Sequence, residues 1–293
     1  MLRRNFLWYS LLFVAGCNAA NSNSIKLPQK LRFAITDVKG LEDLEKNYVT
    51  FRKALEQVLE TQIEFFPVEN LTAAAPALLS GQVDLVLAGP SEYLILHTRA
   101  KATPVVGITR PGYRSVITVR SDSPIKSLEQ LKGKTIALRS IGSTAGHLGA
   151  NQLLIDAGLK PESDVKVVIL HNQSMPALKN GEVDACALSI FGYQRFLAAE
   201  NASEKDFPLI AIGPDLPNDV FVVNNSINPD LLVEMRSRML ANSEKIIQSL
   251  LTNDYFINRF KKSEIVIASD SDYDVIREVY QATGQGKFLQ SGQ

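Results

Sequence analysis

The sequence has little of several residue types, and each shortage excludes a class of protein. Its 293 residues include 2 cysteines, 3 histidines and 1 tryptophan, and two cysteines cannot form a four-cysteine zinc site. Lys+Arg and Asp+Glu number 31 each, so the chain has neither the charge of a strongly basic nucleic-acid binder nor an acidic disordered tail. Hydrophobic residues at 45% and charged residues at 21% are ordinary for a globular protein, and this length favours about two domains.

The short motifs of common enzyme sites are also missing. The sequence contains no Gly-x-Ser-x-Gly elbow, no His-Glu-x-x-His zinc helix, no Gly-x-Gly-x-x-Gly and no phosphate loop ending in Gly-Lys-Ser/Thr. Cys186 lies in an apolar run and is predicted to be a small buried hydrophobe. Ser143 with His147 or His171 could be drawn as nucleophile and base, but no orienting third group accompanies them. We therefore expect a protein that is not an enzyme and holds no metal or cofactor.

No apolar run reaches the roughly 20 residues that a spanning helix needs. Arg3 and Arg4 precede a shorter apolar run at 6–14, which ends in Val14-Ala-Gly-Cys17 and resembles a bacterial lipobox. This pattern predicts a lipoprotein signal peptide at 1–16, lipidation of Cys17 and a polar tether at 17–30, which would place the protein at a membrane surface in the periplasm or elsewhere outside the cytoplasm. Without residues 1–16 the chain has 29 basic and 31 acidic residues, a formal charge of −2. The alternative is a soluble secreted protein in which Cys17 is incidental.

From Leu31 onward, short apolar runs alternate with helical stretches. This alternation favours an α/β architecture with largely parallel sheets. We predict one lobe from 31–117 plus 220–293 and another from 118–219, with crossings near 116–121 and 214–222. The expected strands include 31–35, 63–66, 83–88, 135–138, 165–170, 183–188 and 209–212, and the expected helices include 71–79, 144–157, 173–179, 229–242, 245–251 and 272–283.

An internal similarity supports two lobes of similar construction. Residues 76–84 are Pro-Ala-Leu-Leu-Ser-Gly-Gln-Val-Asp, and residues 176–184 are Pro-Ala-Leu-Lys-Asn-Gly-Glu-Val-Asp. Each segment combines the end of a helix, a glycine suited to a left-handed cap and the start of a buried strand. The repeat distance of 100 residues is too long for a solenoid. Coincidence is the alternative, because the helix–glycine–strand pattern is common.

One turn is suited to an anion. Residues 140–146, Ser-Ile-Gly-Ser-Thr-Ala-Gly, follow a predicted strand and open a predicted helix. A helix start offers unpaired N–H groups and partial positive charge, and Ser143 and Thr144 add hydroxyl donors. The alternative is an ordinary Ser/Thr cap without a ligand. His171 is expected at a strand end, where ligands collect in α/β sheets. His147 is expected in the first turn of the helix that opens after Ser143.

Three stretches carry a family resemblance. They are Pro-Gly-Tyr-Arg-Ser at 111–115, Gly-Ser-Thr-Ala-Gly-His-Leu at 142–148 and Leu-Pro-Asn-Asp at 216–219. Together with the Gly-x-Val-Asp steps at 81–84 and 181–184, they resemble the phosphonate-, phosphite- and phosphate-binding proteins of ABC importers over about 31–285. The resemblance implies a periplasmic-binding-protein fold of two Rossmann-like lobes joined by two hinge strands. It also implies a monomer that holds its solute between the lobes, passes it to a membrane permease and binds no nucleic acid.

The resemblance further implies a set of ligand-binding residues, which match the family's Ser-Thr-Ser helix start, its tyrosine, its strand-end histidine and its hinge aspartate. They are Tyr113, Ser143, Thr144, Ala145, His171 and Asp219. An ionised Asp219 can only accept hydrogen bonds, so it would favour a ligand that keeps a P–OH proton over sulfate.

Three positions depart from the family pattern. Ala145 replaces the second serine, Leu71 stands where family members often have tyrosine, and Phe191 stands where binders of aminoalkylphosphonates place a carboxylate. A ligand ammonium would lack its counter-charge, so we expect phosphate, phosphite or an alkylphosphonate such as methylphosphonate, and not aminoethylphosphonate; a different anion altogether is the alternative. A ligand sensor for a membrane receptor is the alternative, and a phosphate-ester hydrolase is a more distant one.

Overall fold

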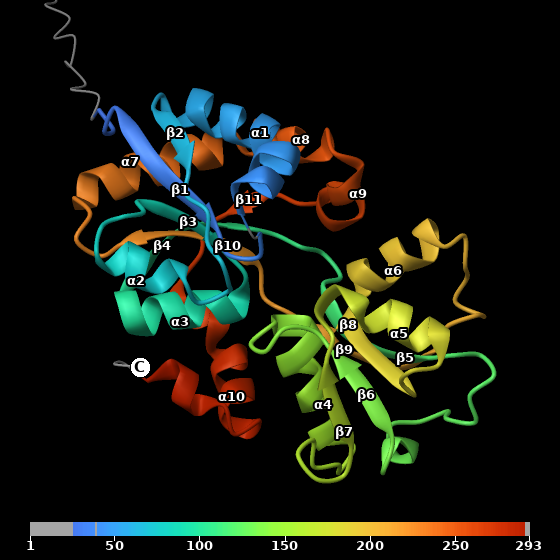
Figure 1. Ribbon diagram of the computed structural model, residues 1–293. Coiled ribbons are helices and arrows are strands. Elements are labelled where there is room, and N and C mark those ends of the chain that lie inside the picture. Colours follow the sequence, from blue (N-terminus) through green and yellow to red (C-terminus); the bar gives the residue numbers. More distant parts are fainter. Residues whose placement is uncertain (1–25, 39, 291–293) are drawn as a thin grey trace, which may run out of the picture.

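The computed structural model describes residues 26–38 and 40–290, in two lobes that each have a central sheet flanked by helices (Figure 1). The predicted signal peptide, Cys17 and most of the tether lie outside these residues. Within them, no helix is both long enough and apolar enough to span a membrane. The predicted two-lobed α/β fold is confirmed.

The first lobe has a six-stranded sheet in the order β11-β4-β10-β3-β1-β2. Strands β1 (Lys30–Ile35), β2 (Gln62–Phe65) and β3 (Leu85–Ala88) run parallel, as expected for βαβ units. Strand β10 (Asp219–Asn224) returns from the second lobe and is antiparallel to β3 and to β4 (Ala102–Ile108), which also pairs with β11 (Ile265–Val266).

Helices bury both faces of this sheet. Along β1, Phe33 and Ile35 enter one core while Ala34 enters the other, because successive side chains point to opposite faces. The first core is covered by α1 (Gly40–Leu59), α7 (Pro229–Ala241), α8 (Ser243–Leu251) and α9 (Asp254–Phe260). The second is covered by α2 (Ala74–Leu79), α3 (Pro90–Ala100) and α10 (Asp274–Ala282).

The second lobe has a five-stranded sheet in the order β7-β6-β8-β5-β9. Strands β6 (Thr135–Leu138), β7 (Lys166–Ile169) and β8 (Ala185–Ser189) are parallel, while β5 (Arg114–Val119) runs antiparallel to β8 and to β9 (Leu209–Asp215). Helix α4 (Gly149–Asp156) packs on one face, and α5 (Ser174–Asn180) and α6 (Ile190–Ala199) pack on the other.

The internal similarity corresponds to equivalent structure in the two lobes. Gly81 and Gly181 both adopt positive φ, +68° and +77°, between a helix and a buried strand. Each following aspartate bonds the neighbouring parallel strand: the Asp84 carboxylate accepts from the Arg32 N–H at 2.7 Å, and the Asp184 carboxylate accepts from the Thr135 N–H at 2.8 Å. The repeated residues thus terminate a helix and align the next strand in both lobes.

The chain crosses between the lobes at 109–113 and at 216–218. The second crossing falls within the predicted 214–222, but the first precedes the predicted 116–121. The predicted boundary between residues 117 and 118 falls inside β5, which pairs with β8 and β9 over its length. The apolar pattern of β5 would fit either sheet, so only its hydrogen-bond partners show that it belongs to the second lobe.

Candidate functional site

One of the predicted ligand-binding residues, Thr144, contacts the other lobe directly. Thr144 opens the helix that follows β6 in the second lobe, and Ser91 lies in the first turn of α3 in the first lobe. The hydroxyl oxygens of these residues are 2.7 Å apart, and the Ser91 N–H donates to Thr144 Oγ1 at 3.2 Å. Both side chains are buried, so the positive ends of two helices meet directly across the lobe interface.

The helix start at Ser143 is wider than predicted. Residues Thr144–Leu148 (η2) form a π-helical turn, in which the Leu148 N–H donates to the Ser143 carbonyl at 3.0 Å, and α4 continues from Gly149. The prediction of one regular helix over 144–157 was therefore wrong in its first turn. Close packing accompanies the widening, because a Cβ on Gly146 would lie 2.2 Å from Arg139 Cγ. Turns of this kind are frequent at functional sites.

The three predicted residues at the start of this turn, Ser143, Thr144 and Ala145, have different surroundings. Ser143 is the N-cap, yet its side chain makes no cap hydrogen bond. Thr144 is hydrogen-bonded to Ser91. Ala145, which stands where the family pattern has its second serine, is buried and has a methyl group in place of the hydroxyl. The first N–H groups of a helix have no intrahelical acceptor, so the backbone still offers donors at Ala145.

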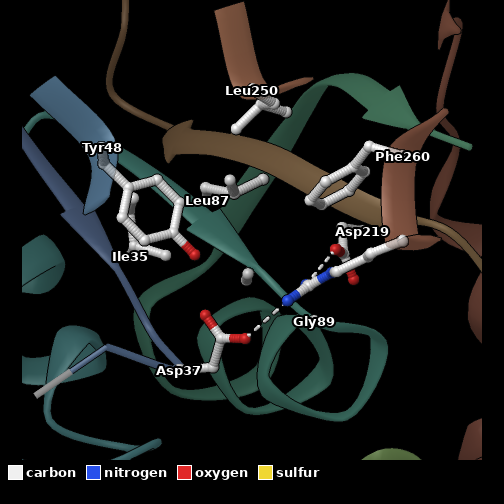
Figure 2. Close-up of a pocket in the computed structure, with 10 residues that line it drawn as sticks. Ile35, Asp37, Tyr48, Leu87, Gly89, Asp219, Leu250 and Phe260 are labelled. Atoms are coloured by element: carbon white, nitrogen blue, oxygen red, sulfur yellow. Dashed lines mark hydrogen bonds and ion pairs between the residues drawn. The ribbon is translucent and has the colours of Figure 1, made fainter. Parts of the chain in front are cut away.

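Asp219 is the centre of a buried charge network. Its carboxylate is 2% exposed and accepts from Arg110 at 2.8 Å and from Arg259 at 2.5 Å, and Arg259 also pairs with Asp37 at 3.0 Å. A pocket lies beyond the carboxyl ends of β1 and β3. Figure 2 shows Asp37 and Asp219 on either side of this pocket. Burial alone would raise the pKa of Asp219, but the charges of Arg110 and Arg259 outweigh it and hold that pKa below its usual value. Asp219 is thus ionised with both oxygens occupied.

Tyr113 lies on top of this network. Its ring is 3.5 Å from the guanidinium carbon of Arg110, a cation–π contact, and stacks on Phe191 with centroids 6.2 Å apart. Tyr113 is 6% exposed, and this burial raises the pKa of its hydroxyl. Phe191 is the second residue of α6, just after β8, so the residue that departs from the family pattern contacts the predicted Tyr113.

Arg139 is a charged residue at the lobe interface that motif spacing did not indicate. It follows the carboxyl end of β6, and its stem covers Gly146 in the anion turn. Among the described residues its guanidinium has no carboxylate within ion-pair distance, and it is half-buried. Burial lowers the pKa of Arg139, with Tyr255, Arg195 and Asp37 as charged or titratable neighbours. An arginine that is partly desolvated and lacks a counter-ion is suited to binding an anion.

The two histidines of the second lobe differ in environment. His171 is exposed, has φ of +50°, and its Nδ1 lies 2.7 Å from Ser140 Oγ. His147 is buried, and its Nδ1 accepts from the Gly142 N–H at 3.2 Å. Neither contact pairs a histidine with Ser143, as a hydrolase site would require.

Burial lowers the pKa of His147 to about 4. His147 is therefore neutral at physiological pH, and because Nδ1 is an acceptor its proton is on Nε2. That nitrogen lies 3.3 Å from Gln285 Nε2, while the buried Gln285 Oε1 has no partner in the described part of the chain. With the Gln285 amide turned over, its oxygen accepts from His147 Nε2–H, which adds a hydrogen bond between the lobes to the two made by Ser91 and Thr144.

Comparison with known proteins adds a family to this geometry. The family model described as "ABC transporter, phosphonate, periplasmic substrate-binding protein" matches residues 33–273, most of the chain. The chain belongs to this family. It is therefore a substrate-binding component of an ABC transporter and not an enzyme, as the resemblance implied.

Individual relatives of the phosphonate-binding family are distant. The Phosphate-import protein PhnD of Mycolicibacterium smegmatis is 23% identical over 283 residues, 89% of this chain and 88% of that protein. The Tetrathionate sensor histidine kinase TtrS of Salmonella typhimurium is 28% identical over 138 residues, 44% of this chain but only 23% of that protein. A solved structure, PhnD1 of Prochlorococcus marinus in complex with methylphosphonate, covers 88% of this chain and 100% of its own, with a TM-score of 0.71 and 19% identity. That likeness shows the fold.

The charged residues that surround the family's motif positions were not predicted from the sequence. Arg110 stands just before the Pro-Gly-Tyr motif, and Arg139 directly follows a predicted strand. The neighbouring sequence could therefore have marked both as candidate site residues. Arg259 and Glu92 had no such local signal, because α9 is about 40 residues after Asp219 in the chain and Glu92 resembles any acidic residue in a first helical turn. Cys186 is fully buried as predicted, and burial raises the pKa of its thiol to about 12.

Proposed function

We propose that this protein binds a small phosphorus oxyanion or phosphonate between its lobes and delivers it to the permease of an ABC importer. The observation that carries the proposal is Arg139, a half-buried guanidinium without a carboxylate partner among the described residues, whose stem lies on the turn that begins with Ser143 and Thr144. Helix-start amides, hydroxyls and a guanidinium together make the donor set that an oxyanion needs.

The charge network beside this turn also supports the proposal, although Asp219 was expected to accept a hydrogen bond from the ligand itself. Both Asp219 oxygens already accept from arginines, so we infer that Asp219 acts by holding Arg110 and Arg259 in place. Arg110 then holds the ring of Tyr113 against Phe191 at the edge of the site. The network is neutral as a unit, with two arginines and two aspartates, so the positive charge for a ligand comes from Arg139, with Arg195 nearby.

We propose that residues of the first sheet, before 109 and after 218, form one lobe and that the residues between the crossings form the other. The contacts Ser91–Thr144 and His147–Gln285 join the lobes, and Leu148 of the second lobe is buried in the second core of the first lobe. A ligand that contacts both lobes would shift the equilibrium toward the closed state.

The ligand we propose is phosphate, phosphite or a simple alkylphosphonate. Phe191, just after β8, stacks on Tyr113, just before β5; this aromatic pair suits a methyl group and lacks the carboxylate that an ammonium would need. Leu71 lies in the turn before α2, and its part in the site stays a prediction.

Calorimetric titration with methylphosphonate tests this proposal. Arg139→Gln removes one charge-assisted interaction and should weaken binding about 10- to 100-fold. The matched control is Arg120→Gln, in the same lobe at the opposite end of the sheet, where Arg120 pairs with Asp122 at 3.0 Å. Equal affinities for the wild type and both variants would contradict the role of Arg139.

We propose lipidation of Cys17 as the membrane anchor and expect the released domain to be a monomer. The lipobox-like sequence Val14-Ala-Gly-Cys17 supports this. Cys17→Ala should move the protein from the membrane fraction to the soluble extract. Intact mass measurement of the wild type should show the added acyl mass.

A sensor role is the second candidate, and the match to the tetrathionate sensor kinase over 138 residues favours it. Cross-linking in cells that carry the lipidated protein distinguishes the two: recovery of a permease supports import, and recovery of a histidine kinase supports sensing.

A further inference from the structure

A chain of hydroxyl groups links the anion turn to a buried carboxyl group in the other lobe. Ser91 Oγ lies 2.7 Å from Thr144 Oγ1 and donates to Glu92 Oε2 at 2.7 Å. Glu92 is 6% exposed, and its carboxylate folds back over Gly89, where a Cβ would come within 2.7 Å of Oε2. Thr144 belongs to the proposed ligand site, so Glu92 is two hydrogen bonds from it.

The groups that face Glu92 are mainly acidic or neutral. Asp37 after β1 and Asp219 at the start of β10 are the carboxylates nearby, each paired with an arginine of the network. The hydroxyl groups of Tyr280 on α10 and Tyr113 also lie within electrostatic range, and Tyr280 donates to the Ser91 carbonyl at 3.4 Å. Burial, and then the charges of Asp37 and Asp219, raise the pKa of Glu92 to about 7.

We propose that Glu92 is a specificity-determining residue, which makes the site prefer an oxyanion that carries an exchangeable proton over one that has none. The inference rests on the proposed function, because it assigns a selectivity to that same site. It commits to the class of hydrogen phosphonates, hydrogen phosphite and hydrogen phosphate, in preference to sulfonates and sulfate.

The physical reason is the direction of the hydrogen bonds. When Glu92 is ionised it can only accept, so the Ser91 hydroxyl points toward it and the Thr144 hydroxyl can point toward Ser91. Both hydroxyl groups then offer lone pairs to a ligand, which suits a P–OH donor and repels a group with acceptors alone. When Glu92 is protonated it donates to Ser91, and the Ser91 and Thr144 protons become free to turn toward the ligand.

A sulfonate therefore binds only when Glu92 has taken a proton from solvent. A hydrogen phosphonate supplies the proton from its own P–OH group, so it binds while Glu92 is ionised. Above the neutral range this makes sulfonate binding about tenfold weaker for each pH unit. Glutamine at position 92 would remove this dependence, since its amide donates at every pH. Glutamine also keeps the helix-start role of glutamate, so the variant should fold.

The test is calorimetric titration of the wild type, Glu92→Gln and the control Glu42→Gln with methylphosphonate and methanesulfonate at pH 6 and pH 8. Glu42 is an exposed acidic residue in the first turn of α1. We expect Glu92→Gln to gain at least tenfold in methanesulfonate affinity at pH 8 relative to the wild type and the control. A gain of less than about twofold, with methylphosphonate still bound, would overturn the inference and leave the proposed function intact.

Proton uptake gives a second readout that needs no variant. Titration of the wild type with methanesulfonate at pH 8 in two buffers of different ionisation enthalpy should show about one proton taken up per ligand, because Glu92 must take that proton from solvent. Uptake near zero would refute the protonation of Glu92 on sulfonate binding. If the wild type binds neither anion, the proposed function fails and the inference fails with it.

Discussion

Asp219→Asn tests the charge network more sharply than any other substitution. The Asp219 carboxylate is 2% exposed and bonds Arg110 at 2.8 Å and Arg259 at 2.5 Å. Asparagine keeps the size but removes the charge, so Arg110 loses its only ion pair among the described residues, while Arg259 keeps Asp37. Removing one partner of a buried ion pair typically costs about 3–5 kcal/mol, because the other charge stays buried without compensation.

Urea denaturation of the ligand-free protein measures this cost, which corresponds to a decrease in the midpoint of about 1 M. The matched control is Asp215→Asn, four residues earlier, which removes an exposed ion pair with Arg114 and should change the midpoint very little. The sign of the pH dependence is also set. The folded-state pKa of Asp219 is lowered, so its contribution is complete at neutral pH and is lost as the pH falls through that lowered value.

Two outcomes would refute this account of Asp219. One is a loss of stability no larger than that of the Asp215→Asn control. The other is unchanged ligand-free stability together with abolished binding of methylphosphonate, which would mean that Asp219 contacts the ligand directly, as the family resemblance implied.

Two further predictions concern the anion turn. Gly146→Ala places a Cβ 2.2 Å from Arg139 Cγ, so it should displace that side chain and weaken methylphosphonate binding about tenfold by calorimetry; binding equal to wild type would contradict the packing. His147, with its pKa lowered to about 4, should make the protein less stable as the pH falls from about 6.5, by up to about 3 kcal/mol. His147→Gln should remove that part of the pH dependence in denaturation curves from pH 7 to pH 4, and an unchanged slope would show that His147 is protonated in the native state.

The lobed architecture was predictable because it depends on local patterns. Alternating apolar runs gave the parallel strands, and the repeated glycine and aspartate at 81, 84, 181 and 184 marked equivalent steps in the two lobes. The first crossing was misplaced because β5 has no local feature that tells its own sheet from the other. Its partners β8 and β9 lie about 70–100 residues further along the chain.

The motif residues of the site were predictable, whereas their partners were not. Thr144 and Tyr113 lie in short conspicuous motifs, but each is held by a residue that no motif marks: Thr144 by Ser91 and Tyr113 by Arg110. The role of Asp219 depends on Arg259, which lies in α9, 40 residues later in the chain. Such contacts arise from the packing of elements distant in sequence, and spacing along one segment carries no information about them.

Calorimetric titration of the purified wild type, stripped of bound ligand by unfolding and refolding, shows whether this protein binds a small phosphorus oxyanion or phosphonate. Phosphate, phosphite, methylphosphonate, aminoethylphosphonate and sulfate form the panel. We expect micromolar or tighter binding of one of the first three, with aminoethylphosphonate and sulfate much weaker at pH 8. Silence across the panel, or a preference for sulfate, would contradict it.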